Sequence, residues 1–170
     1  MKPIICAGFA LVVCLGGATP VRAELPPAGE DGVVFMGDEH PVMARAFARA
    51  KAGLDEFLTL AQAPGRNHVG FALKVGLDTG DGTEYVWIVD FRSDKSGKFS
   101  GTINNDVEMT RKWKLGDVYS FHRDDIVDWI YFDRETRKMH GNYTLCALLT
   151  EEKPEEAARV KAEYKLDCDF

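Results

Sequence analysis

The chain has 170 residues, of which 45% are hydrophobic and 11% aromatic, and its formal net charge is −6. This length fits one domain with a sizeable core, and the aromatic content argues against intrinsic disorder. The acidic balance argues against binding to nucleic acid or to an anionic lipid surface, since both attract basic patches.

The first 23 residues have the three-part pattern of a secretory signal peptide. Lys2 supplies the positive start, residues 4–15 are apolar, and Val21 and Ala23 occupy the small-residue positions of a cleavage site. The apolar run is shorter than the ~20 residues that span a bilayer. The sequence therefore predicts a bacterial periplasmic or secreted protein that starts at Glu24 and has no membrane span after cleavage.

Two other interpretations of this leader stay open. A lipoprotein modified at Cys14 would need a small residue before it, where the sequence has Val13. A retained membrane anchor would need a longer apolar run. Cleavage would remove Lys2 and Arg22, which leaves 19 basic and 27 acidic residues and a formal charge of −8.

Cysteine usage fits export. Cys146 and Cys168 would remain as an even pair in an oxidising compartment, and we expect them to form a disulfide. The alternative is two unrelated buried thiols.

Downstream of the leader, residues 24–40 are rich in Pro and Gly and predict a flexible tether. A helix is expected from Pro41, because apolar residues follow at spacings of three and four. They are Met43, Phe47, Ala50, Leu54, Phe57 and Ala61. The sequence Ala63-Pro64-Gly65 ends this helix.

The pattern then changes to period two, which predicts strands. Residues 69–77 and 85–91 alternate on either side of a turn at 78–82 and form a hairpin, with Tyr85 and Trp87 on one face of the return strand. Further strands are expected at 98–104, from 116–117 onward, and in a last hairpin of 128–133 with 139–150. The segment 107–114 is expected to be a loop or one helical turn. Pro154 starts a short acidic helix to about residue 165.

The predicted fold is α+β. A curved antiparallel sheet of about five or six strands packs against one long N-terminal helix, with a short C-terminal helix, in a single domain of residues 41–170.

No pattern predicts a cofactor, a metal or a catalytic nucleophile. The loop at 78–82 has glycine at the third and fifth positions of a calcium loop, where oxygen-bearing side chains are needed, and Val89 at the twelfth, so it fits a hairpin turn. His122, Asp124 and Asp125 stand without a second histidine or any known metal-ligand spacing. Cys146, placed in the middle of a strand, is expected to be structural.

The most informative polar residue is Asp128. Strand alternation places it on one face with Ile126, Ile130 and Phe132, where a carboxylate needs hydrogen-bond donors or a shifted pKa. The candidate partners are Asn142 and Thr144. We expect a structural role first and a binding role second. The tryptophans Trp87, Trp113 and Trp129 pack in the core or line a groove.

Several of these segments, in this order, resemble the YegJ-like domain of unknown function (DUF2314). They are Glu84-Tyr85-Val86-Trp87, Gly101 with Asn104-Asn105, Gly116-Asp117, Ile126-Val127-Asp128-Trp129 and Gly141-Asn142-Tyr143-Thr144. The resemblance covers about residues 43–149. It implies a small bacterial α+β domain, often exported, with no established activity. Asp106 and Val107 stand where the family often has a proline.

Three functional hypotheses follow. The first is a non-enzymatic binding or interaction module for a protein, peptide or envelope component, using Asp128, Trp129, Asn142, Thr144 and Trp87. The second is a small hydrolase that uses Asp128 with His122 or His140. The third is an inhibitor or immunity-type protein whose charge steers a basic partner.

Overall fold

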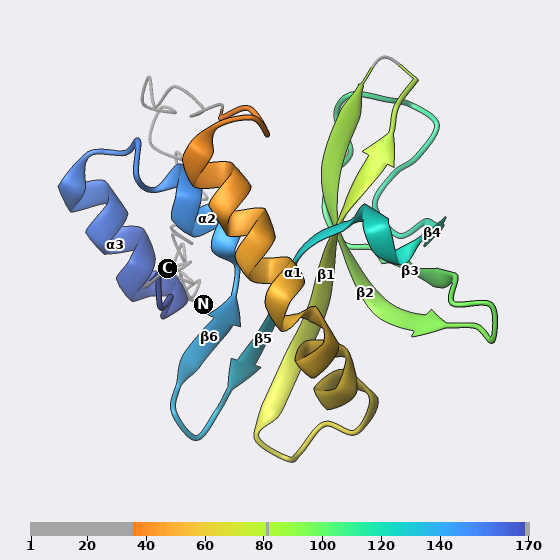
Figure 1. Ribbon diagram of the computed structural model, residues 1–170, viewed down its shortest axis with the longest axis horizontal. Helices are drawn as coiled ribbons and strands as arrows, with labels where there is room; N and C mark the ends of the chain where they lie inside the picture. Colours follow the sequence, from red (N-terminus) through yellow and green to blue (C-terminus); the bar gives the residue numbers. More distant parts are fainter. Residues whose placement is uncertain (1–35, 81, 169–170) are drawn as a thin grey trace, which may run out of the picture. The chain divides into compact units, whose positions relative to one another are not determined.

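The computed structural model describes residues 36–80 and 82–168 (Figure 1), so the predicted signal peptide and most of the predicted tether lie outside the described residues. The described chain forms three α-helices, a short 3-10 helix and six strands. They are α1 (Pro41–Gln62), β1 (His68–Asp78), β2 (Thr83–Ser93), β3 (Phe99–Ile103), β4 (Val118–Phe121), η1 (Arg123–Asp125), β5 (Ile126–Asp133), β6 (Lys138–Gly141), α2 (Tyr143–Leu148) and α3 (Pro154–Tyr164).

The six strands form one antiparallel sheet in the order β4-β3-β2-β1-β5-β6. Local hairpins account for most neighbours, and the β1–β5 pairing joins the two halves of the sheet. The sheet is open, with a long helix before it and a short helix near the C-terminus. The predicted α+β class, strand number and helices are therefore confirmed.

Helix α1 is the amphipathic helix that the sequence predicts. Pro41 stands in its first turn, and Nδ1 of His40 accepts a hydrogen bond from the Val42 backbone N–H at 3.3 Å. Its buried face divides into two parts. Leu54 and Phe57 pack on the sheet, whereas Met43 and Ala46 join a smaller cluster with α2. Met36, the first described residue, is buried in that smaller cluster.

The main core lies between the second half of α1 and one face of the sheet. On β1, Leu73, Val75 and Leu77 are fully buried, as the alternation predicts. On β2 the fully buried residues are Val86 and Ile88. Tyr85 and Trp87, the predicted apolar stripe of that strand, lie on the opposite face, because Trp87 pairs directly with Lys74.

A bulge in β5 changes the predicted facing of Asp128. Lys74 pairs with Asp128, but the next residue of β1, Val75, pairs with Ile126, which leaves Val127 as an extra residue. Ile126 therefore faces the main core, whereas Asp128 faces the other side. The prediction that the two share one face is wrong for this reason.

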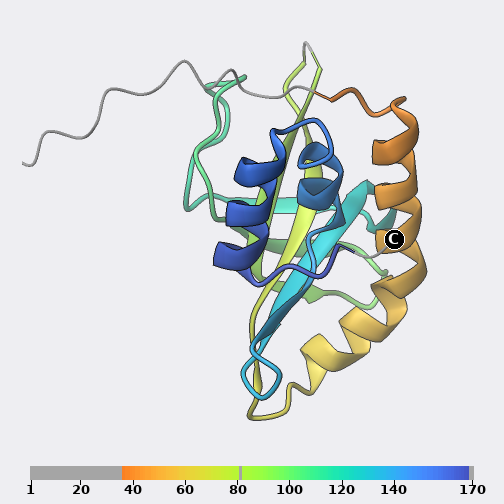
Figure 2. The same cartoon turned by 90° about the vertical axis from the view of Figure 1, so that its left-hand side faces the viewer.

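The predicted last strand is shorter than expected. Strand β6 ends at Gly141, and residues 143–148 form helix α2 instead of continuing the strand. Cys146 is thus buried on a helix and not in the middle of a strand. In both views α2 lies between α1 and α3 (Figures 1 and 2). The segment 107–114 contains no helix.

The change from β6 to α2 requires a glycine. Gly141 has φ +80°, and a Cβ atom there would lie 1.9 Å from the carbonyl oxygen of Trp129. The next residue, Asn142, has φ 57°, also in the left-handed region that asparagine tolerates. These two residues turn the chain out of β6 and into α2.

The C-terminal segment is held to the domain by covalent and polar contacts. Cys146 and Cys168 form a disulfide with a Cα–Cα distance of 5.4 Å. Leu166 makes a parallel bridge to Met139, and Lys138 pairs with Asp167 at 3.3 Å. Among the described residues, no helix combines the length and the apolarity needed to cross a bilayer.

We predict that the substitution Cys168→Ser destabilises the protein by about 3 kcal/mol, because a disulfide closing a loop of this size restricts the unfolded chain by that amount. Urea unfolding of the oxidised parent, the reduced parent and the variant measures it. The reduced parent is the matched control and should unfold at the same urea concentration as the variant. Two reactive thiols in the denatured parent without reductant would contradict the bridge.

Candidate functional site

A hydrogen-bonded carboxylate lies at the junction of β5 and α2. Asp128 is 0% exposed. Its Oδ2 accepts hydrogen bonds from the backbone N–H and from the hydroxyl of Thr144, both at 2.8 Å, and its Oδ1 accepts one from the Trp129 backbone N–H at 2.9 Å. Asp128 thus satisfies the Thr144 N–H at the start of α2, one of the N–H groups that a helix itself leaves unpaired.

Lys74 extends this arrangement from the neighbouring strand. Its Nζ donates a hydrogen bond to Oγ1 of Thr144 at 3.0 Å and lies 5.5 Å from the ring centroid of Trp87. Lys74 pairs across the sheet with Asp128 on one side and with Trp87 on the other. The result is a chain of polar groups from Lys74 through Thr144 to Asp128, which we call the Lys-Thr-Asp chain.

Burial moves the two ionisable ends of this chain in opposite directions. Desolvation raises the pKa of Asp128, although its hydrogen bonds and the charge of Lys74 oppose the shift. Desolvation lowers the pKa of Lys74, and the charge of Asp128 opposes that shift. The energy difference between the ion pair and its neutral form is therefore smaller here than in water.

The structure brings together some of the residues singled out in the sequence and separates others. Asp128 and Thr144 are in contact, and Trp87 joins them through Lys74. The side chain of Asn142 contacts Met139 Sδ at 3.6 Å instead of Asp128. Trp129 points to the opposite side of β5, where its Nε1 donates to the carbonyl oxygen of Ala50 at 2.9 Å.

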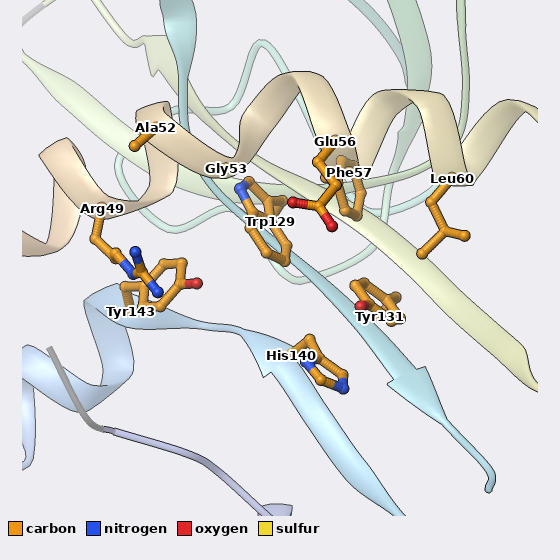
Figure 3. A pocket seen from close by; sticks show the side chains of 10 residues that line it. All are labelled: Arg49, Ala52, Gly53, Glu56, Phe57, Leu60, Trp129, Tyr131, His140 and Tyr143. Atoms are coloured by element: carbon orange, nitrogen blue, oxygen red, sulfur yellow. The ribbon is translucent and has the colours of Figure 1, made fainter. Parts of the chain in front are cut away.

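A pocket of about 270 Å³ lies on that opposite side, between α1 and the β5–β6 hairpin. Its walls are mostly aromatic and its rim is charged (Figure 3). It is lined by Arg49, Ala52, Gly53, Glu56, Phe57, Leu60, Trp129, Tyr131, His140 and Tyr143. Of these, the sequence analysis singled out Trp129 as a binding residue.

Close ring contacts build the floor of this pocket. Phe57 stacks on Trp129 with ring centroids 5.0 Å apart, and Tyr131 stacks on His140 at 4.7 Å. Gly53 permits the approach of α1, because a Cβ there would lie 2.8 Å from Trp129 Cζ2. The floor is therefore a continuous aromatic surface that spans two strands and a helix.

Polar groups stand around that floor. Figure 3 shows Arg49 and Glu56 on α1 facing the space above Tyr131 and Tyr143. The guanidinium of Arg49 lies 5.8 Å from the ring centroid of Tyr143. Burial raises the pKa of Tyr131, and the nearby charge of Glu56 adds to this, so the phenol stays protonated and can donate a hydrogen bond.

The described residues do not place a histidine next to Asp128, as the hydrolase hypothesis requires. All three of its hydrogen bonds come from Trp129 and Thr144, and neither His122 nor His140 is a partner. His140 belongs to the pocket on the other side of β5. Within residues 36–80 and 82–168, no group of three or more His, Cys, Asp or Glu side chains could hold a metal ion.

Comparison of the sequence with known proteins places the chain in a family. Residues 40–168 match the model of a family described as "Uncharacterized protein conserved in bacteria (DUF2314)". The chain belongs to this family. It is also 28% identical over 132 residues to "Uncharacterized protein YegJ" of Escherichia coli strain K12, which covers 78% of this chain and 83% of that protein. No solved structure matches significantly.

We predict that Asp128→Asn is nearly as destabilising as Asp128→Ala, at about 1–3 kcal/mol. Both carboxylate oxygens accept from backbone N–H groups, so an amide would have to direct its own NH₂ group at a donor. Asp94→Asn is the matched control, because one oxygen of Asp94 accepts all three of its hydrogen bonds and an amide oxygen can replace it. Urea unfolding measures all three variants, and equal stability of D128N and D94N would refute the argument.

The raised pKa of Asp128 also predicts that the stability of the protein depends on pH. The folded pKa of Asp128 is raised above the unfolded value of about 3.9. Its contribution to stability is therefore fully present below pH ~3.9 and is lost as the pH rises through the folded pKa. D128N lacks this titration, so the stability difference between the parent and D128N should narrow as the pH rises.

Proposed function

We propose that this protein is a non-enzymatic binding module of the bacterial envelope, and that the pocket of Figure 3 holds a peptide end or an amino-acid-like group of its partner. The observation that carries the proposal is the pairing of opposite charges over an aromatic floor. Arg49 suits a carboxylate, Glu56 suits an ammonium group, and the stacked rings suit the apolar part between them.

The spacing of the two charges supports this ligand class. Arg49 and Glu56 are seven residues apart on α1, so they lie on the same helix face and about 10 Å apart along its axis. Both side chains are long and exposed, and can therefore reach toward each other over a bound group. A zwitterionic ligand satisfies both, whereas a simple anion or cation would leave one of them facing a like charge.

The size of the pocket supports a small bound group. Its volume of about 270 Å³ is near or below the lower end of the ~300–1,000 Å³ typical of small-molecule sites. An amino acid, a short peptide end or one side chain of a partner protein fits this volume better than a large cofactor does.

Location outside the cytoplasm is part of the proposal. The leader pattern of residues 1–23 and the disulfide between Cys146 and Cys168 both suit an oxidising compartment. Expression of the full chain in a Gram-negative host should give a periplasmic product whose intact mass starts at Glu24. A product that retains Met1 or carries a lipid on Cys14 would contradict this.

We predict that Arg49→Gln and Glu56→Gln each weaken binding about tenfold or more, since a hydrogen bond to a charged group contributes ~1.5–3 kcal/mol. Arg45→Gln is the matched control, because Arg45 is exposed on the same helix and does not line the pocket. NMR titration with tripeptides bearing free or blocked ends measures affinity, read at the resonances of Tyr131 and His140.

Blocking the peptide ends should reproduce the effect of removing the matching charge. A peptide with a blocked C-terminus should bind the parent protein no more tightly than a peptide with a free C-terminus binds the R49Q variant. The proposal fails if R49Q and R45Q bind the free peptides equally, or if no peptide shifts the pocket resonances.

A further inference from the structure

A second pocket lies on the other side of β5. Asp128 and Trp129 are consecutive residues of this strand, so their side chains point to opposite faces. Trp129 lines the pocket of Figure 3, whereas Asp128 binds Thr144, which lines the second pocket. The second pocket has a volume of about 170 Å³.

One amine stands in an otherwise mainly apolar wall of this pocket. Met36, Met43, Phe47 and Leu148 form the apolar part, and the Lys-Thr-Asp chain reaches the surface of the pocket through Lys74 and Thr144. Lys74 is partly buried, whereas every other lysine within residues 36–80 and 82–168 is exposed. Lys74 is therefore the lysine whose environment departs furthest from water.

The charges around the pocket argue against an anionic ligand. Asp128 lies behind Lys74 in the Lys-Thr-Asp chain. The carboxylate of Asp38 also lines the pocket and accepts a hydrogen bond from the Tyr85 hydroxyl at 2.6 Å. The ammonium group of Lys74 is thus outnumbered by two carboxylates in and behind the pocket wall, which leaves no net positive charge for an anion, and a neutral ligand is favoured.

The Lys-Thr-Asp chain also supplies what a nucleophilic amine needs. A lysine reacts as a neutral amine, and desolvation lowers the pKa of Lys74 toward that form. The Thr144 hydroxyl lies 3.0 Å from Nζ and 2.8 Å from the Asp128 carboxylate. It can accept a proton from the amine while it passes its own to Asp128, so the proton has a route away from the nitrogen.

We propose that Lys74 is a carbonyl-reactive amine, and that a small neutral aldehyde with an apolar body enters this pocket and forms an imine with its Nζ. The volume admits roughly six non-hydrogen atoms at ~30 Å³ each. This site is separate from the binding pocket of Figure 3, and the inference does not depend on the function proposed for that pocket.

The reaction balances without an oxidant or reductant. The nitrogen lone pair forms a C–N bond with the carbonyl carbon, and the π electrons move to the oxygen, which takes up a proton from the nitrogen. The C–O bond of this carbinolamine then breaks, and the oxygen leaves as water with the second amine proton. The Thr144 hydroxyl is placed to carry these protons.

The test treats the folded protein at pH 7.5 with pentanal and cyanoborohydride, which reduces an imine to a stable secondary amine. Peptide mapping by mass spectrometry then gives the extent of labelling at each lysine. We expect Lys74 to be labelled at least tenfold faster than the exposed lysines, and its labelling rate to rise with pH at a lower midpoint than theirs. With a bulky aldehyde such as naphthaldehyde, which does not fit the pocket, Lys74 should no longer be labelled faster than the exposed lysines.

Two variants complete the test. Lys74→Arg should abolish the fast incorporation, whereas Lys114→Arg, at an exposed position, should leave it unchanged. The proposal would be overturned if, in the parent, the exposed lysines were labelled uniformly while Lys74 stayed unmodified. This result does not depend on whether K74R folds. Fast single labelling that persists in folded K74R would overturn it as well.

Discussion

Two hydrogen bonds from Thr144 to the buried carboxylate of Asp128 fix the start of α2 against β5. Both pockets depend on this contact. Tyr143, the first residue of α2, lines the pocket under α1, and Thr144, the second, lines the pocket around Lys74. A carboxylate is suited to this position because it can accept hydrogen bonds on both oxygens while it lies among apolar side chains.

Much of the fold is predictable because its signals are local. The three- and four-residue spacing on α1 and the alternation on β1 each depend on neighbours within one element. Helix α2 was mispredicted as a strand because its six residues include Tyr143 and Thr144, types that favour strands. Its helical start depends on an acceptor 16 residues earlier in the chain, which no local pattern reveals.

Some residues of the candidate sites are likewise predictable from local sequence, and others are not. Asp128 stood out in the sequence as a charge among apolar residues, and Thr144 as a nearby donor, and the structure places them in contact. Lys74 was missed, although the alternation of β1 already placed it opposite the core residues.

Arg49 and Glu56 look like ordinary solvent-facing residues of α1, and their seven-residue spacing was the signal that could have paired them. His140 reaches its pocket only through the β5–β6 hairpin.

The central pairing of β1 with β5 has a consequence for the order of folding. Lys74 and Asp128 are separated by about 50 residues of chain, whereas β1–β2 and β5–β6 are local hairpins. The hairpins can form early, but the loop between β1 and β5 must close before the lysine meets the carboxylate. Until then both charges remain hydrated, so their desolvation follows the formation of the local hairpins. Because the contact between β1 and β5 stabilises the protein only late in folding, it should slow unfolding more than it speeds folding.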